Sequence, residues 1–161
     1  LLLNGFNERS EVVTKAVYSH SEKLQFKVYE KFMGSSSLWA NDIHAANYRD
    51  SLKVIDVEAV SLDEYFPKDK KIDLIKIDAE GAEPHIWKGA RNLIKSNPDV
   101  KIIMEFAPSV IQVSYDSVAQ FYEDIQSVGM KIYKINHDAT LKLMSLDEAE
   151  NISIHDVVIR K

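Results

Sequence analysis

The chain has 161 residues, of which 45% are hydrophobic, so it is long enough for one globular domain with its own core. Asp and Glu outnumber Lys and Arg by 25 to 20, and the formal charge of −5 argues against a nucleic-acid backbone as the main partner. The absence of cysteine excludes disulfides and thiolate metal sites, and no apolar run approaches the roughly 20 residues that span a membrane.

The N-terminus shows no signal-peptide pattern, and we expect a soluble cytoplasmic domain with no membrane partner. Residues 1–5 have the pattern of a last helical turn, with Asn4 or Gly5 as its C-terminal stop. Because no initiator Met precedes this turn, we expect residues 1–161 to form a single domain that is truncated at its N-terminus.

The first half of the chain contains three predicted strands and one long loop. Residues 12–17 are rich in valine, and residues 24–29 alternate apolar and polar side chains, as strands do. Residues 31–51 show no periodicity and predict a long loop with one turn of helix, a kind of loop that often has a function. Residues 53–60 alternate again and predict an outer or partly exposed strand.

The middle of the chain predicts a strand followed by a helix. Ser61 and Glu64 have capping-box spacing, which predicts a short helix ending near Pro67. Residues 72–77 are an apolar run typical of a strand buried on both faces of a parallel sheet. A helix follows, with Pro84 in its first turn, and Asn97-Pro98 ends it.

The last third of the chain predicts an antiparallel addition to that sheet. Residues 100–106 form a second apolar strand, and Ser117 starts a helix that stops near Gly129. Residues 131–135 and 140–144 predict a hairpin, and residues 154–159 a last strand. The fold class is therefore α/β, with a parallel centre and a late antiparallel strand.

Asp78 and Glu80 follow the strand at residues 72–77, and the carboxyl ends of such strands are where open α/β sheets bind ligands. Either carboxylate can instead cap the following helix, and Glu83 suits the positive end of that helix better than it suits catalysis. His85 is a candidate general base but has no recognisable orienting partner, so a surface or packing role competes. For Lys76 we favour a structural ion pair.

Glu105 ends the neighbouring strand, so Asp78, Glu80 and Glu105 together are a possible set of oxygen ligands for Mg²⁺. Their spacing matches no diagnostic ligand pattern, and we predict no metal.

Four stretches carry a family resemblance: SLDEY at residues 61–65, IDLIKIDAEGAE at 72–83, KGA at 88–90 and IME at 103–105. Together they resemble the FkbM-type methyltransferases, which are class I enzymes that use S-adenosylmethionine on a Rossmann-like sheet. The KIDAEGAE run with the downstream Lys-Gly is the most specific part, and the resemblance covers most of the chain.

The resemblance implies a role for each candidate residue. Asp78 and Glu80 are then catalytic, beside the methylsulfonium group of S-adenosylmethionine and the acceptor hydroxyl. Ala16 and Val17, with Asp78, bind the cofactor, although a buried strand end explains the first two equally well. The substrate-binding residues are Glu80, Glu105 and Ser36, where Ser36 lies in a loop that also includes Ser35, Ser37 and Trp39. The acceptor is then a small molecule or glycan carrying a hydroxyl group.

The chain departs from the family pattern at the cofactor's Gly-rich turn. It has five glycines and no Gly-x-Gly, so the resemblance implies that the N-terminal strands of the sheet, with that turn, lie upstream. The strand at residues 72–77 then exposes an edge. Two alternatives follow: a non-catalytic Rossmann-like binding module, and a metal-dependent hydrolase, which lacks a supporting His pair.

Overall fold

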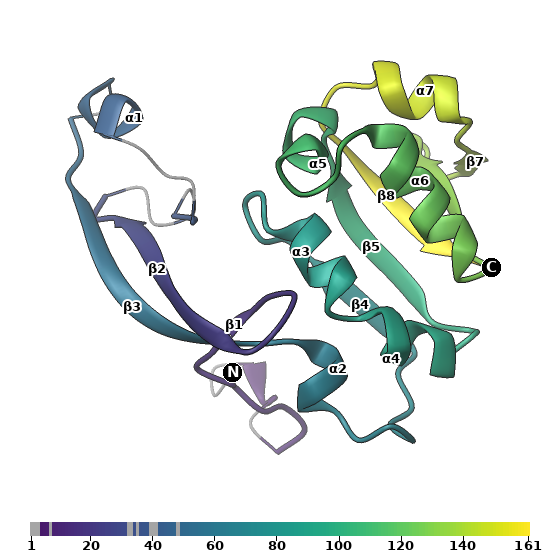
Figure 1. The fold of residues 1–161 in the computed structure, drawn as a ribbon, viewed down its shortest axis with the longest axis horizontal. Helices are drawn as coiled ribbons and strands as arrows, with labels where there is room; N and C mark the ends of the chain where they lie inside the picture. The colour runs from purple at the N-terminus through teal and green to yellow at the C-terminus, as the bar shows by residue number, and fades with distance from the viewer. Residues whose placement is uncertain (1–3, 7, 32–33, 35, 39–41, 48) are drawn as a thin grey trace.

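The strands form two sheets, where the sequence predicts one. The computed structural model describes residues 4–6, 8–31, 34, 36–38, 42–47 and 49–161. A three-stranded sheet has the order β1-β3-β2, with β1 at Ala16–Val17, β2 at Glu22–Tyr29 and β3 at Leu52–Val60. β1 is parallel and β2 antiparallel to β3, and β2 and β3 form a long curved hairpin (Figure 1).

The second sheet has five strands in the order β4-β5-β8-β6-β7. β4 and β5 are parallel, whereas β8 is antiparallel to both β5 and β6, and β7 is antiparallel to β6. The predicted change from parallel to antiparallel pairing is confirmed, but the parallel pair lies at one edge of the sheet. The strands are β4 Leu74–Ile77, β5 Lys101–Phe106, β6 Lys131–Ile135, β7 Leu141–Leu143 and β8 His155–Arg160.

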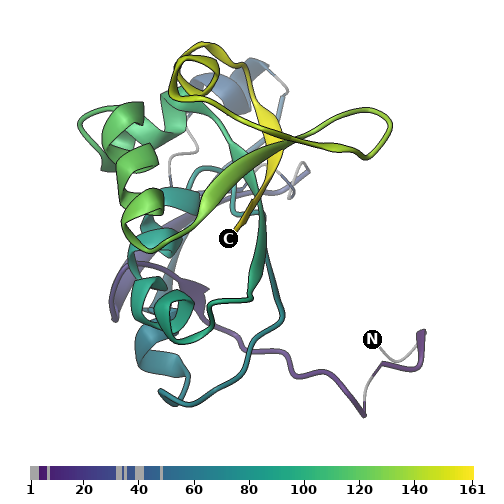
Figure 2. The ribbon, with the colours of Figure 1, turned by 90° about the vertical axis from the view of Figure 1, so that its right-hand side faces the viewer.

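Helices cover one face of the five-stranded sheet, and Figure 2 shows them on one side of it. Within the described ranges, no helix has the length and apolarity that a membrane crossing requires. The helices are α1 Asp42–Asn47, α2 Leu62–Tyr65, α3 Glu83–Lys88, α4 Arg91–Ser96, α5 Pro108–Ser114, α6 Val118–Ser127 and α7 Leu146–Asn151.

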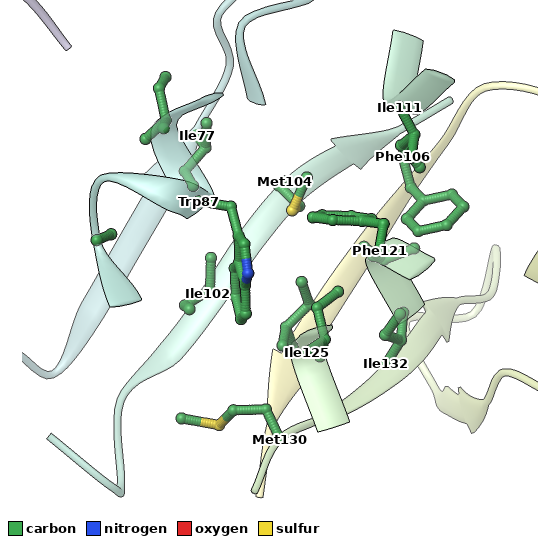
Figure 3. Packing of buried hydrophobic residues seen from close by; sticks show 14 of the residues in the cluster. Ile77, Trp87, Ile102, Met104, Phe106, Ile111, Phe121, Ile125, Met130 and Ile132 are labelled. Carbon is green, nitrogen blue, oxygen red and sulfur yellow. The ribbon is translucent and has the colours of Figure 1, made fainter. Parts of the chain in front are cut away.

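The core lies between helices α3 to α7 and the five-stranded sheet, and Phe121 of α6 is near its centre (Figure 3), whereas α1 lies at the far end of β2 and β3 (Figure 1). The Phe121 ring is edge-on to Trp87 of α3, with centroids 6.0 Å apart, and lies 6.1 Å from the ring of Phe106 at the end of β5. Ile102 and Met104 of β5 are fully buried on this face, as the two-residue period of a strand requires. This packing fixes α3, and therefore the turn before it, on the sheet.

The predicted single helix after the turn is in fact two helices, α3 and α4, and Asp63 is the reason. In an uninterrupted helix the N–H of Leu93 would donate to the carbonyl of Gly89. Instead the N–H of Asp63 donates to that carbonyl at 2.8 Å, and the Asp63 carboxylate accepts the N–H groups of Asn92 and Leu93 at 3.1 and 2.7 Å. Asp63 thus caps α4 from outside the helix.

Gly89 also brings the end of β1 against α3. A side chain at this position would overlap the Tyr18 carbonyl oxygen, and its Cβ would lie 2.9 Å from the Cβ of Ser61. Only glycine permits this close approach. Residues of the SLDEY and KGA stretches therefore meet at the junction between the two sheets, where they have structural roles.

Two strand predictions need correction. The strand predicted at residues 12–17 is only β1, because Val12 and Val13 have no partner strand and are 69% and 39% exposed. The strand predicted to be buried on both faces, β4, is buried on one face only, since Leu74 is 56% exposed and Ile77 is buried, while its position at the edge of the sheet is the one expected. β3 is partly exposed as predicted, although it is the middle strand of its sheet.

The capping predictions are confirmed at both sites. Ser61 and Glu64 form the capping box of α2, and the Ser117 hydroxyl accepts the Gln120 N–H at the start of α6. The predicted hairpin appears as β6 and β7, and the loop at 31–51 contains α1. Helices α5 and α7 were not predicted from the sequence.

Candidate functional site

A cavity of about 510 Å³ lies between the three-stranded sheet and β4. This volume is within the roughly 300–1,000 Å³ range of small-molecule sites. Asp78 and Glu80 line it where β4 ends. The apolar part of its lining comes from both sheets and the loop after β2, and includes Val17, Leu24, Phe26, Leu38, Ile75 and Ile77.

The segment from Asp78 to Ala82 is a tight turn with an unusual backbone. The N–H of Ala82 donates to the carbonyl of Ala79 at 3.1 Å, and the two residues between them, Glu80 and Gly81, have φ values of +48° and +103°. Positive φ at both central positions is the pattern of a type I′ turn. Gly81 adopts it freely, whereas a non-glycine residue such as Glu80 is strained there by about 1–3 kcal/mol.

Glu83, the first residue of α3, stabilises this turn. Its side chain is 2% exposed, and its two carboxylate oxygens accept the N–H of Ala79 at 2.8 Å and the N–H of Gly81 at 3.0 Å. The sequence predicts that Glu83 complements the positive end of the helix, but it does not predict these bonds. The Gly81 turn two residues earlier was the available signal, because a carboxylate at the start of a helix can reach back to preceding N–H groups.

Asp78 forms an ion pair with Lys76, with Oδ2 3.2 Å from Nζ. Both side chains are well exposed, at 66% and 48%, so the pair contributes little to stability. Lys76 therefore has the ion-pair role that we favoured, and its partner is the candidate catalytic carboxylate itself.

Five of the six predicted site residues line the one cavity: Ala16, Val17, Ser36, Asp78 and Glu80. They come from β1, from the loop after β2 and from the turn after β4, so the fold brings together residues more than 60 positions apart. The roles assigned to them remain predictions. Ser35 and Trp39, named with Ser36 as loop candidates, lie outside the described residues.

Glu105, the sixth residue, lies on β5 and does not line the cavity. Burial raises the pKa of its carboxyl group, and the neighbouring carboxylates of Glu83, Glu80 and Asp78 raise it further. Glu105 is therefore close enough to contribute negative charge to the site. In the part of the chain that the structure describes, no group of three or more His, Cys, Asp or Glu side chains could hold a metal ion.

His85 faces Tyr18 and does not line the cavity. The two rings are stacked with centroids 4.3 Å apart, and the Tyr18 hydroxyl lies 3.3 Å from His85 Nε2. Burial lowers the pKa of His85 to about 4, and the positive charge of Lys88 contributes to this shift. A histidine with this pKa is neutral at pH 7 and a weak base, which favours the packing role.

The walls contributed by Leu24 and Phe26 were not predicted as site residues. The alternation in residues 24–29 indicates which side chains share a face of the strand, but not which element that face meets. Here the face meets the end of β4 across the cavity.

One of three comparisons with known proteins found a match. A family model described as the methyltransferase FkbM domain matches residues 4–129, from before β1 to just beyond α6. The searches of curated proteins and of solved structures found no match. Since the matched region is most of the chain and contains the turn at residues 78–82, the chain belongs to the FkbM methyltransferase family.

Proposed function

We propose that the protein is an S-adenosylmethionine-dependent O-methyltransferase that acts on a hydroxyl group of a sugar, glycan or other natural product. The observation that supports this proposal best is the position of Asp78 and Glu80, at the acidic end of a cavity with apolar walls. Family membership supports methyl transfer in general, and the donor and the acceptor class are our inference from the site.

The residues of the cavity fit such a donor. S-adenosylmethionine supplies a methyl group carried by a positively charged sulfur. Carboxylates attract a positive charge, and Asp78 and Glu80 provide two of them beside apolar side chains that suit a ring system. Nearby Glu105 increases the negative charge of this region.

The same carboxylates suit the acceptor. Methyl transfer to a hydroxyl is an in-line displacement: the oxygen forms a bond to the methyl carbon, the carbon–sulfur bond breaks, and its electron pair stays on sulfur. An oxygen of Asp78 or Glu80 accepts the hydroxyl proton. Alignment of the reacting groups can lower the barrier of such a reaction by about 7–11 kcal/mol. A general base accelerates it by about 10²–10⁴-fold, which corresponds to only about 3–5 kcal/mol. Orientation by the carboxylates is therefore the larger effect.

Calorimetry with S-adenosylhomocysteine tests the proposal on the full-length protein, with any sequence upstream of Leu1 included. We expect saturable binding, and transfer of labelled methyl groups from S-adenosylmethionine to hydroxyl-bearing acceptors. The absence of heat at millimolar ligand would reject the proposal and favour a non-catalytic binding module.

A further inference from the structure

Glu83 is the one charged side chain that is buried among the described residues. A buried carboxylate is unfavourable unless hydrogen bonds compensate for the lost water. Here the compensation comes from the N–H groups of Ala79 and Gly81, one on each carboxylate oxygen. Both groups belong to the turn that carries Glu80 and follows Asp78, and Glu83 itself does not line the cavity.

The turn needs such a partner because of its backbone. Glu80 has a φ of +48°, a conformation that a non-glycine residue leaves readily when nothing holds it. The Ala82 N–H to Ala79 carbonyl bond closes the turn, but it leaves the N–H groups of Ala79 and Gly81 for another acceptor. Glu83 accepts hydrogen bonds from both N–H groups, which lie on either side of Glu80. It therefore fixes the backbone conformation of Glu80 and the direction of its side chain.

We propose that Glu83 is a positioning residue for methyl transfer: it holds the turn at residues 78–82 so that Asp78 and Glu80 point into the cavity. The inference rests on the proposed function for its kinetic consequence, but not for its structural one. The proposal gives the three carboxylates of residues 78–83 two different roles: Asp78 and Glu80 line the cavity, and Glu83 holds the turn that positions them.

The competing explanation is that Glu83 only complements the positive end of α3. The two explanations differ in what they require of the side chain. An interaction with the helix dipole needs the charge alone, so Glu83→Asp should preserve it. Positioning of the turn needs the full length of the glutamate side chain and both of its oxygens, so neither Glu83→Asp nor Glu83→Gln should hold the turn. The aspartate side chain is one methylene shorter, and the glutamine side chain offers one acceptor oxygen for two N–H groups.

Asp63 provides a matched control. Its carboxylate also accepts two backbone N–H groups, those of Asn92 and Leu93, but these belong to α4, which does not line the cavity. Asp63→Asn therefore makes the same chemical change and is expected to destabilise the fold to a similar extent. It should leave the turn at residues 78–82 unchanged.

The experiment compares Glu83→Gln, Glu83→Asp and Asp63→Asn in the full-length protein by amide hydrogen exchange and by steady-state kinetics. We expect both Glu83 variants to lose exchange protection at Ala79 and Gly81. Their kcat should fall about 10²-fold, the loss typical of a misplacement by about 1 Å, with KM changed much less. Asp63→Asn should keep both the protection and kcat.

Two results would overturn the proposal: unchanged protection at Ala79 and Gly81, or recovery of kcat in Glu83→Asp. If a Glu83 variant does not fold, Gly81→Ala strains the same turn while keeping the carboxylate, and normal kcat in that variant would also overturn it. If no protein transfers methyl groups, the proposed function fails, whereas the exchange data still decide whether Glu83 holds the turn.

Discussion

The indole N–H of Trp87 donates a hydrogen bond to the carboxylate of Asp124 at 2.9 Å, and this bond joins α3 to α6. The same Asp124 oxygen accepts the hydroxyl of Tyr115 at 2.8 Å, while the other lies 3.0 Å from the Arg91 guanidinium. Burial and the hydrogen bond to Asp124 raise the pKa of Tyr115 well above its usual range, so the phenol remains a donor. One carboxylate thus satisfies donors from three segments.

Replacement of Asp124 by alanine should lower the free energy of unfolding by about 3 kcal/mol, because it leaves the buried donors of Trp87 and Tyr115 without their acceptor. The ion pair with Arg91 adds little to this loss, since the Arg91 side chain is 37% exposed and also donates to Ser127. Glu123→Ala is the control, since Glu123 is exposed on the same helix and its loss should change stability by no more than about 0.5 kcal/mol. Urea denaturation measures both. Equal effects of the two variants would show that the Asp124 contacts add nothing.

Gly89→Ala should destabilise the junction between the two sheets. The added methyl group overlaps the Tyr18 carbonyl oxygen, which is backbone and cannot move without shifting β1. Overpacking of this kind costs about 1–3 kcal/mol. Gly34→Ala is the control, because a Cβ at Gly34 meets nothing within 4 Å. Thermal denaturation, with hydrogen exchange of the Tyr18 N–H that donates to Val60, would detect the change; a native Tm for Gly89→Ala contradicts it.

A repeated tetrapeptide shows how far the sequence alone predicts the fold. Ser-Leu-Asp-Glu occurs at residues 61–64 and again at 145–148, and both copies form a capping box. Only the first is among the predicted helix starts, whereas the second lies between two strands and starts α7. Local hydrogen bonds within four residues are readable from sequence. The same applies to Pro108, whose position at the start of α5 was an unused signal.

Contacts between distant segments were not predictable in this way. The break between α3 and α4 depends on Asp63, which lies 26 residues before the Gly89 carbonyl that it contacts. Asp78 and Glu80 were predictable from local sequence, because ligands of open α/β sheets bind at the carboxyl ends of strands. That they face β1 and β2 across the cavity depends on tertiary packing. The sequence therefore identified the acidic end of the site and not its apolar walls.

Glu105→Gln should stabilise the protein at pH 7. Burial and then the nearby carboxylates raise the pKa of Glu105, so the folded protein binds its proton more tightly than the unfolded chain does. The penalty for the charged form is complete above the raised pKa, and it disappears below the unfolded value of about 4.3. The advantage of Glu105→Gln in urea denaturation should therefore shrink as the pH falls towards 4. Glu123→Gln controls for the loss of one negative charge, and a less stable Glu105→Gln at pH 7 contradicts this assignment.

His85 should contribute to acid sensitivity. The folded protein keeps it neutral down to about pH 4, because burial lowers its pKa to that value, whereas the unfolded chain takes up the proton near pH 6.5. The unfolded state therefore binds more protons between these values, and stability should fall as the pH drops from about 6.5 to 4. Nuclear magnetic resonance titration of the ring measures this pKa directly. His85→Gln should flatten the acid limb of the stability curve, and a titration midpoint above 6 would rule out the shift.

Asp78→Asn should reduce methyl transfer while preserving the fold. The side chain is 66% exposed and its ion pair with Lys76 is on the surface, so the free energy of unfolding should change by less than about 1 kcal/mol. The amide cannot accept the hydroxyl proton and attracts a sulfonium charge less strongly, so kcat should fall about 10²–10⁴-fold. Lys76→Gln is the matched control: it breaks the same ion pair from the other side but leaves the carboxylate, so kcat should stay within a few-fold of the wild type. If both variants lose activity equally, the ion pair and not the Asp78 carboxylate is what methyl transfer requires, and if neither does, Glu80 is the remaining candidate at this end of the cavity.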